Sequence, residues 1–194
     1  MGLGRRNFLR NGLFSLSAVG FPSSGIAEPE QPASFVVTAG KCRIDGPWTV
    51  HGEPSFFDKI SGADVGGRMS VIEVKTPPGQ GPHMHIHLEQ NEWMYLLEGS
   101  FGLQCGTEKT VLQTGDSFMA PKGIPHSYVV LGDKPARHLN IYDPAGEIEA
   151  FFRDYEKNHP PGAKPDPANA AESEKRYRVR VVGPPLKPSA FSKS

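Results

Sequence analysis

The sequence has little of what several large classes of protein require. Only two of its 194 residues are cysteine, and its 21 Lys and Arg residues balance 21 Asp and Glu residues, so the formal net charge is zero. A balanced charge gives no general attraction to a polyanion, which argues against nucleic acid as a partner. Beyond the first residues, no apolar run is long enough to span a bilayer. The length suits one globular domain.

The first 27 residues have the pattern of an export signal. Arg5 and Arg6 stand in a stretch that resembles the twin-arginine export motif, and residues 13–21 form a short, mildly apolar segment. Small residues at 25–27 offer a signal peptidase site. We expect a signal peptide over residues 1–27 that engages the twin-arginine export machinery and yields a periplasmic or secreted protein without membrane attachment. The alternative is a chance arginine pair in a disordered tail.

The two cysteines, Cys42 and Cys105, lie far apart in the sequence. An oxidising compartment would permit a disulfide between them, but two isolated positions carry no geometric information about pairing. We expect buried free thiols, and the question of pairing stays open.

Histidine is concentrated in one segment. Three of the seven histidines, His83, His85 and His87, occupy alternate positions within five residues. Alternate residues of a strand project from one face, so His85 and His87 can direct their imidazoles toward one point, which indicates a metal site. His83 would lie roughly 13 Å from His87 along a straight strand, too far for one ion to bind all three easily.

Glu92 follows five residues after His87 and has the wrong parity to share its face in a continuous strand. Residues 88–91 must therefore turn or bulge, which their polar composition permits. Residues 93–97 have the aromatic and aliphatic composition of a strand buried on both faces, so Glu92 should enter a core. A buried carboxylate is costly unless it is paired or bound to a metal. The glutamate and the histidines therefore predict one shared site.

Two stretches of the chain resemble the two motifs of the cupin superfamily. The first motif, G-x5-H-x-H-x4-E-x6-G, is met at Gly79, His85, His87, Glu92 and Gly99. The second motif, G-x5-P-x-G-x2-H-x3-N, is met at Gly115, Pro121, Gly123 and His126 and departs at Val130. The approach to the first motif and residues 181–186 are also similar to single-domain cupins related to quercetin dioxygenase.

The resemblance implies an all-β fold, the cupin jelly-roll or double-stranded β-helix barrel, over residues 34–143. It also implies one metal site with three histidines and one glutamate, which fall on His85, His87, Glu92 and His126. The metal would be one divalent transition metal ion, Fe, Mn, Ni or Cu. Val130 stands where the second motif has Asn. This difference would change neighbouring hydrogen bonds, but the ligand set is complete without the Asn.

Short apolar runs between Gly, Pro, Asp and Asn turns predict the strands of this barrel. We expect strands over residues 35–38, 48–50, 55–57, 69–74, 101–105, 110–112, 127–131 and 138–142, with a hairpin between the motifs. After residue 143 the apolar period becomes helical. We expect residues 144–186 to form a helical and Pro-rich extension that packs on the barrel, with helices over 146–157 and 168–177. Residues 187–194 would be a disordered tail.

Several functions remain open, because cupins with four ligands include oxygenases, isomerases, decarboxylases and binding proteins. We favour a dioxygenase similar to quercetin 2,3-dioxygenase that acts on a small phenolic or enolic compound. Glu92 would be both ligand and catalytic base, with burial raising its pKa unless the metal opposes the shift. The substrate pocket would include His83, at the mouth of the barrel, and Met94, Phe118 and Tyr128.

Two alternatives come from other classes. The first is a non-catalytic periplasmic cupin that binds a metal or a small molecule. The second is a sugar-phosphate isomerase, which would need basic residues around the pocket, whereas only Lys122 lies inside either motif. A homodimer is expected by analogy with other cupins.

Overall fold

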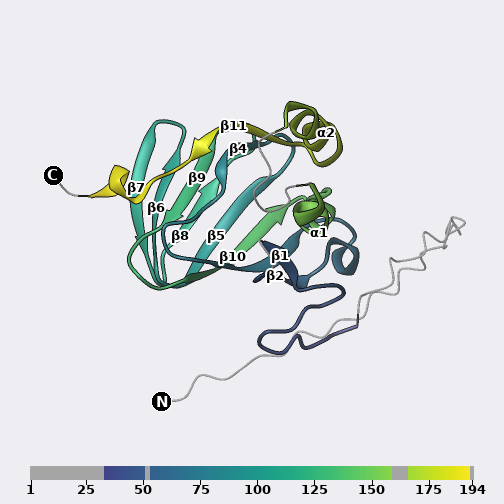
Figure 1. Cartoon of the computed structure of the whole chain (residues 1–194). Coiled ribbons are helices and arrows are strands. Elements are labelled where there is room, and N and C mark those ends of the chain that lie inside the picture. Colours follow the sequence, from purple (N-terminus) through teal and green to yellow (C-terminus); the bar gives the residue numbers. More distant parts are fainter. Residues whose placement is uncertain (1–32, 51–52, 159–165, 193–194) are drawn as a thin grey trace, which may run out of the picture. The chain divides into compact units, whose positions relative to one another are not determined.

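Two antiparallel β-sheets face each other in the computed structural model, which describes residues 33–50, 53–158 and 166–192 (Figure 1). The signal peptide expected over residues 1–27 and residues 159–165 of the Pro-rich segment lie outside the described residues. Within the described part of the chain, no helix is long and apolar enough to cross a bilayer. The expected all-β architecture, two antiparallel sheets with a short helical extension, is confirmed.

The first sheet has six strands in the order β1-β2-β3-β10-β5-β8. Their bounds are β1 (Trp48–Val50), β2 (Glu53–Ile60), β3 (Ser70–Thr76), β5 (Asn91–Glu98), β8 (Ser117–Ala120) and β10 (Ala136–Asp143). A short 3-10 helix, η1 (Gly62–Val65), connects β2 to β3. Strand β10 lies between β3 and β5, so its inward side chains occupy the middle of the barrel wall.

The second sheet has five strands in the order β11-β4-β9-β6-β7. Their bounds are β4 (His83–His87), β6 (Ser100–Cys105), β7 (Glu108–Gln113), β9 (His126–Val130) and β11 (Val179–Pro185). Strands β6 and β7 form the hairpin expected between the two motifs. Strands β4 and β9 are neighbours and pair at His85 and His126, so the second sheet joins the histidines of the two motifs.

Strand β5 is buried on one face only. Glu92, Met94 and Leu96 are buried, whereas Trp93 between them is 40 % exposed. The expectation that residues 93–97 are buried on both faces is therefore wrong, because no second layer within the described residues covers the outer face of the sheet at Trp93. The alternation directs Glu92 into the barrel.

One expected strand is absent. Residues 35–38 have no regular secondary structure, and Val36 is 88 % exposed. The composition of this segment suits a strand, but a strand also needs a hydrogen-bonded neighbour, and none pairs with it in the described part of the chain. The other expected strands are present, several of them longer than the sequence pattern indicated.

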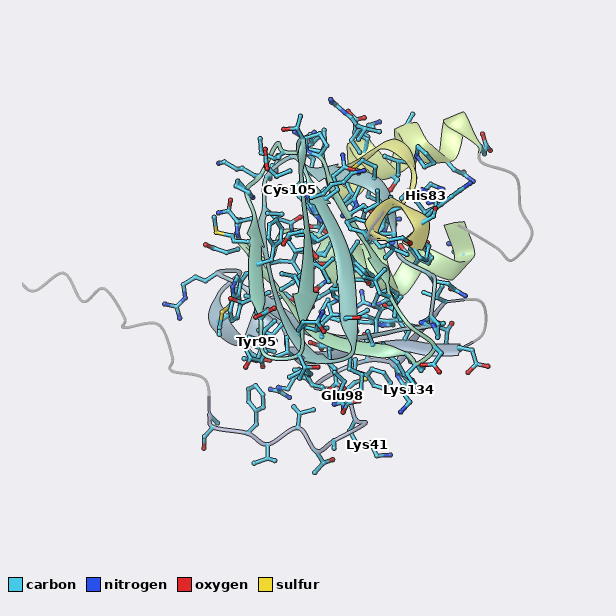
Figure 2. The ribbon with its side chains drawn as sticks, turned by 90° about the vertical axis from the view of Figure 1, so that its left-hand side faces the viewer. Lys41, His83, Tyr95, Glu98, Cys105 and Lys134 are labelled. Carbon is cyan, nitrogen blue, oxygen red and sulfur yellow. The ribbon has the colours of Figure 1, made fainter. Side chains whose placement is uncertain are left out.

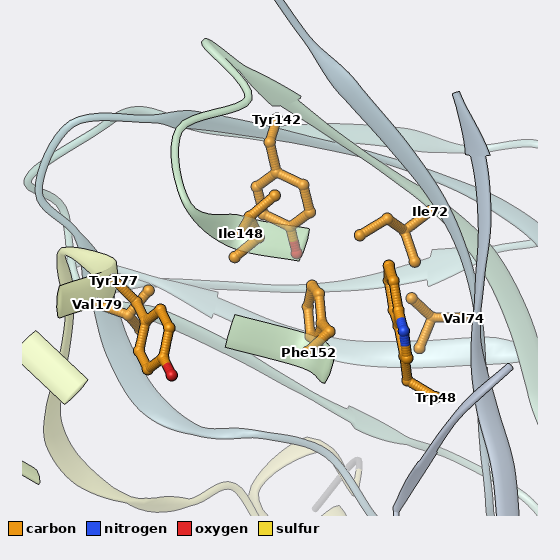
Figure 3. Packing of buried hydrophobic residues seen from close by; sticks show 8 residues of the cluster. All are labelled: Trp48, Ile72, Val74, Tyr142, Ile148, Phe152, Tyr177 and Val179. Atoms are coloured by element: carbon orange, nitrogen blue, oxygen red, sulfur yellow. The ribbon is translucent and has the colours of Figure 1, made fainter. Parts of the chain in front are cut away.

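Two helices, α1 (Ile148–Asn158) and α2 (Pro167–Tyr177), follow the barrel at the positions expected for them. Ile148 and Phe152 of α1 are buried in a cluster with Trp48 and Tyr142. Figure 3 shows Phe152 between these two rings, and its centroid is 6.1 Å from that of Tyr142. The apolar face of α1 therefore packs against the barrel beside the strand that carries Tyr142.

The C-terminal segment contributes more structure than expected. Strand β11 pairs with β4, so the extension adds a strand to the second sheet. Residues Pro188–Phe191 form the 3-10 helix η2, so the disordered tail expected over residues 187–194 is wrong there. The Phe191 ring lies against Gly102, where a Cβ atom would collide with it. A glycine on β6 thus provides the room in which the end of the chain docks.

Candidate metal centre

A break between two strands brings the first three candidate ligands together. Strand β4 ends at His87 and β5 begins at Asn91, so the expected turn is confirmed. The break over residues 88–90 resets the alternation of inward and outward side chains. His87 and Glu92 are consequently both buried, each with 3 % of its surface exposed.

The loop before β9 brings in the fourth candidate ligand. Gly123 has a φ of +80°, a conformation that glycine adopts without steric cost, and its N–H donates to the carbonyl of His87 at 2.8 Å. This bond ties the second motif to the end of the first. His126 then opens β9 directly opposite His85.

His85, His87, Glu92 and His126 form one cluster in which each residue offers a ligand atom within 4.8 Å of the others. Glu92 Oε2 lies 2.9 Å from His126 Nε2, 3.1 Å from His87 Nε2 and 3.9 Å from His85 Nε2. The contact with His126 is a hydrogen bond, whereas neither nitrogen of His87 has a hydrogen-bond partner in the described part of the chain. The structure therefore brings together all four residues that the sequence predicted.

Backbone carbonyls orient two of the imidazoles. His85 Nδ1 lies 2.8 Å from the carbonyl oxygen of His83, and His126 Nδ1 lies 2.9 Å from that of Ile124. A carbonyl accepts only, so each Nδ1 carries the proton and donates it. This leaves each Nε2 as the atom that can bind a metal.

The donor set fits one divalent transition metal ion. Three imidazole nitrogens and one carboxylate oxygen suit Fe, Mn, Ni and Cu. In the described part of the chain, His87 Nδ1 has no hydrogen-bond partner and His87 Nε2 has only the 3.1 Å contact with Glu92 Oε2, so this buried imidazole is costly unless a ligand satisfies it. The side chain of His85 is 14 % exposed, whereas those of His87, His126 and Glu92 are 2–4 % exposed. The site therefore meets solvent on the side of His85.

The charges within the cluster oppose the effect of burial. Burial raises the pKa of Glu92, but the hydrogen bond from His126 and the neighbouring His87 together hold this pKa well below its ordinary value. Burial lowers the pKa of His126, but the Glu92 carboxylate outweighs burial and raises the pKa above 6.5. For His85, burial and the two neighbouring imidazoles lower the pKa to about 3. The expectation that burial raises the pKa of Glu92 does not hold in the metal-free site, because histidines surround it.

Two residues at the site were missed from the sequence. The Tyr142 hydroxyl donates to Glu92 Oε1 at 2.9 Å and accepts from Asn140 Nδ2 at 2.9 Å. The Tyr142 ring also lies 5.3 Å from that of His87. Tyr142 thus holds one oxygen of Glu92 and leaves the other facing the histidines. The available signal was the alternation of polar residues His138, Asn140 and Tyr142 in a strand.

His83 stands apart from the cluster. It is exposed at the start of β4, and Figure 2 places it at the same end of the strands as Cys105, opposite the end that carries Glu98. Cys105 pairs in register with His126, so this end is the one at which the cluster lies. The place of His83 at the mouth of the barrel stays a prediction. Its contact with substrate stays a prediction.

The other three predicted pocket residues belong to the apolar core. Met94 and Tyr128 are buried in one cluster, and Phe118 packs against it partly buried. The Tyr128 hydroxyl shares a hydrogen bond of 2.9 Å with Thr76 Oγ1. Core packing and this hydrogen bond explain the burial of these residues without any bound ligand. Their role as walls of a substrate pocket stays a prediction.

The two cysteines are free thiols and half-buried. Burial raises the pKa of both Cys42 and Cys105, which disfavours the reactive thiolate. They contribute no disulfide to the barrel.

Comparison with known families matches residues 72–142 to the cupin domain family. This segment contains all four residues of the cluster. Among curated proteins, the uncharacterized protein MJ1618 of Methanocaldococcus jannaschii is 30 % identical over 74 residues, which cover 38 % of this chain and 59 % of that protein. The chain thus spans 59 % of the length of this relative. The matched segment and the two-sheet fold support the cupin superfamily.

Solved structures with a similar arrangement were also found. KdgF from a Halomonas species is 22 % identical with a TM-score of 0.46, covering 53 % of this chain and 89 % of that chain. A predicted oxalate decarboxylase from Thermotoga maritima is 20 % identical with a TM-score of 0.44, covering 46 % and 78 %. These likenesses carry no information about the reaction of this protein.

Proposed function

We propose that this cupin-fold protein is a metal-dependent dioxygenase that acts on a small phenolic or enolic compound. The observation that carries the proposal is the convergence of three imidazoles and one carboxylate within 4.8 Å in a largely buried site. His85, His87, His126 and Glu92 would hold one Fe, Mn, Ni or Cu ion. The bound ion would supply Lewis acidity and, if redox-active, electron exchange with dioxygen.

The residues around the cluster favour an acidic substrate hydroxyl. Glu92 is the nearest carboxylate that can accept a proton, and its low pKa makes it a weak base in the metal-free site. Proton transfer to a weak base is most favourable from an acidic donor, and phenols and enols are more acidic than ordinary alcohols. Tyr142 keeps Glu92 in place through Oε1 while Oε2 remains directed at the site. Burial of the carboxylate limits competition from bulk water.

Glutamine at position 92 provides the experiment. Glu92→Gln keeps the shape and one oxygen but removes the basicity, so oxygen consumption with a flavonol should fall by roughly 10²-fold or more in metal-loaded protein. Metal content should be measured on the same samples to separate catalysis from binding. A Gln variant that turns over the substrate as fast as the parent would refute the base role.

A second candidate function is a non-catalytic cupin that binds a metal or a small molecule. The observation that favours it is that Met94 and Tyr128, which were expected to line a substrate pocket, belong to the apolar core cluster instead. The two functions differ in turnover. Parent protein loaded with iron, manganese, nickel or copper that consumes no oxygen with any phenol or enol, and leaves its absorption spectrum unchanged, would make binding the better assignment.

We also propose that the protein is exported by the twin-arginine pathway. The support is the Arg5-Arg6 pair and the apolar segment after it, in a part of the chain outside the described residues. This pathway carries folded proteins, so the metal could be loaded before copper and zinc of the periplasm compete for the site. Replacing both arginines by lysine should retain the protein in the cytoplasm. An unchanged periplasmic yield would refute this signal.

A further inference from the structure

His138 of β10 lies inside the barrel with no exposed surface, and neither ring nitrogen has a hydrogen-bond partner in the described part of the chain. The register of β10 places it opposite Val74 of β3 and Leu96 of β5, which are both apolar. Burial lowers the pKa of His138 to about 4, so the ring is neutral at pH 7. A neutral imidazole has one donor and one acceptor, and buried polar atoms of this kind normally have partners.

Two aromatic rings lie beside His138 without satisfying it. The rings of Phe101 and Tyr128 are stacked with centroids 4.3 Å apart, and the His138 centroid is 4.9 Å from the first and 5.0 Å from the second. If the His138 ring lay over the outer face of Phe101, its centroid would be much farther from Tyr128 than from Phe101, and the reverse would hold over the outer face of Tyr128. His138 therefore lies alongside the edges of the pair, and its N–H group does not bond to an aromatic face.

A second unpartnered atom lies two residues along the same face of β10. Asn140 Oδ1 is buried without a hydrogen-bond partner in the described part of the chain, whereas Asn140 Nδ2 donates to Tyr142. Residues two apart on a strand are separated by roughly 7 Å. This is the spacing of the backbone, and two hydrogen bonds of about 2.8 Å let one water molecule join polar atoms up to roughly 5.6 Å apart, so one water bridges these side chains where they lean toward each other.

We propose that one bound water bridges His138 and Asn140 and that His138 is, through this water, a positioning residue for Glu92. The water accepts from the N–H of His138 and donates to Asn140 Oδ1. It therefore holds the amide with its nitrogen toward Tyr142. If the amide were turned over, Oδ1 would compete with Glu92 for the single hydroxyl hydrogen of Tyr142.

The consequence is a chain of hydrogen bonds from the interior to the metal centre. It leads from His138 through the water and Asn140 to Tyr142, and ends on Glu92 Oε1. Glu92 Oε2 then faces the histidines, where it is hydrogen-bonded to His126. The inference rests on the proposed function only in that the cluster binds a metal, and it is independent of any turnover.

A crystal structure of the full-length protein at high resolution tests the water directly. We expect density for one water within hydrogen-bond distance of Asn140 Oδ1 and of one ring nitrogen of His138. A dry interior between these two side chains would overturn the proposal. This measurement needs neither bound metal nor activity.

The affinity for Ni²⁺, measured by calorimetric titration, tests the positioning role. His138→Phe keeps a flat ring but removes both nitrogens, and it should raise the Kd for Ni²⁺ by up to roughly tenfold, as loss of outer support for a ligand does. His138→Gln restores a donor and an acceptor and should stay within about twofold of the parent. Leu103→Val is the matched control for disturbance of the same core.

The comparison of these variants decides the role. If His138→Phe and Leu103→Val change the Kd equally, His138 is a packing residue and the proposal fails. If the Phe variant does not fold, the crystal structure of the parent and the affinity of the Gln variant still decide. Parent protein that binds Ni²⁺ but consumes no oxygen would overturn the dioxygenase and leave this inference intact.

Discussion

The two ends of the barrel interior are built from the same strands but carry opposite chemistry. Strand β5 places Glu92 at one end and Leu96 at the other, and β9 places His126 at one end and Val130 at the other, all of them buried. At the polar end, the Glu92 carboxylate accepts from His126 through one oxygen and from Tyr142 through the other. At the apolar end, side chains such as Leu96 and Val130 pack into one hydrophobic cluster.

This difference separates stability from function. Burial of apolar surface at one end favours folding, whereas burial of a carboxylate and three imidazoles at the other is costly unless the groups are paired or bound to a metal. The polar end is therefore best explained by the ligand that it binds. Variants at the two ends should change different measured quantities.

The largest effect is expected at the apolar end. Phe101 is fully buried, stacked on Tyr128 and in edge contact with His138, so Phe101→Ala should lower the free energy of unfolding by about 3–5 kcal/mol through lost burial and a residual cavity. Urea denaturation measures this change. Metal bound per folded chain should stay near that of the parent. If Phe101→Ala lost its metal while its free energy of unfolding stayed unchanged, the two ends would not have separate roles.

The next effect concerns the polar end. His126→Ala removes a ligand and the hydrogen bond to Glu92, so the Kd for Ni²⁺ should rise by more than roughly 100-fold, beyond the effect of a lost supporting residue. His85→Ala should also lower metal content strongly. His83→Ala is the matched control, because His83 lies two residues before His85 on β4 but outside the cluster, and it should retain most of the metal. Equal losses at His83 and His85 would overturn the assignment.

A smaller effect is expected from the residue that supports Glu92. Tyr142→Phe keeps the buried ring against Phe152 but removes the hydroxyl that donates to Glu92 Oε1. The Kd for Ni²⁺ should rise by roughly 10- to 100-fold, the range for lost support of a ligand. Calorimetric titration measures it. An unchanged Kd would mean that the hydrogen bond from Tyr142 is not needed to hold the Glu92 carboxylate in its binding position.

The smallest effect is the pH dependence of metal binding. The raised pKa of His126 keeps this ring protonated somewhat above pH 6.5 in the metal-free protein, and the proton must leave when Nε2 binds a metal. Affinity should therefore rise with pH through this range, by at most about tenfold per pH unit. Titrations near pH 6.5 in buffers of different ionisation enthalpy should show release of roughly one proton. Absence of proton release would place a neutral imidazole at position 126.

His126 and Glu92 both contribute to the pH dependence of stability without metal. The folded pKa of His126 is raised, so its contribution is complete below pH 6.5 and is lost as the pH rises through the raised value. The folded pKa of Glu92 is lowered, so its contribution is present above pH 4.5 and is lost as the pH falls through the lowered value. Their ion pair therefore supports the metal-free fold most in the weakly acidic range between these limits.

Much of the site could be predicted from the sequence because its signals are local. The alternation of His85 and His87 and the polar break before Glu92 follow from strand geometry alone. His126 could be added only through the resemblance to a known motif, since 33 residues separate it from Glu92 and no local period connects them. The strands and helices were also readable where apolar residues recur at a regular period.

What could not be predicted depends on register and on neighbours. Tyr142 reaches Glu92 because β10 pairs with β5 so that these two residues lie opposite each other, which no single strand reveals. The pKa of Glu92 moves opposite to the effect of burial because three histidines surround it. Docking of Phe191 depends on the space above Gly102, which exists only after β6 has formed its sheet.

The central claim is that His85, His87, Glu92 and His126 bind one metal ion. Anomalous X-ray diffraction from crystals grown with Ni²⁺, recorded at the nickel edge, tests it directly. We predict one anomalous peak per chain, within about 2.0–2.2 Å of the Nε2 atoms of the three histidines and an oxygen of Glu92. A crystal with no peak at this cluster, or with the strongest peak at His83 or another surface group, would contradict the account.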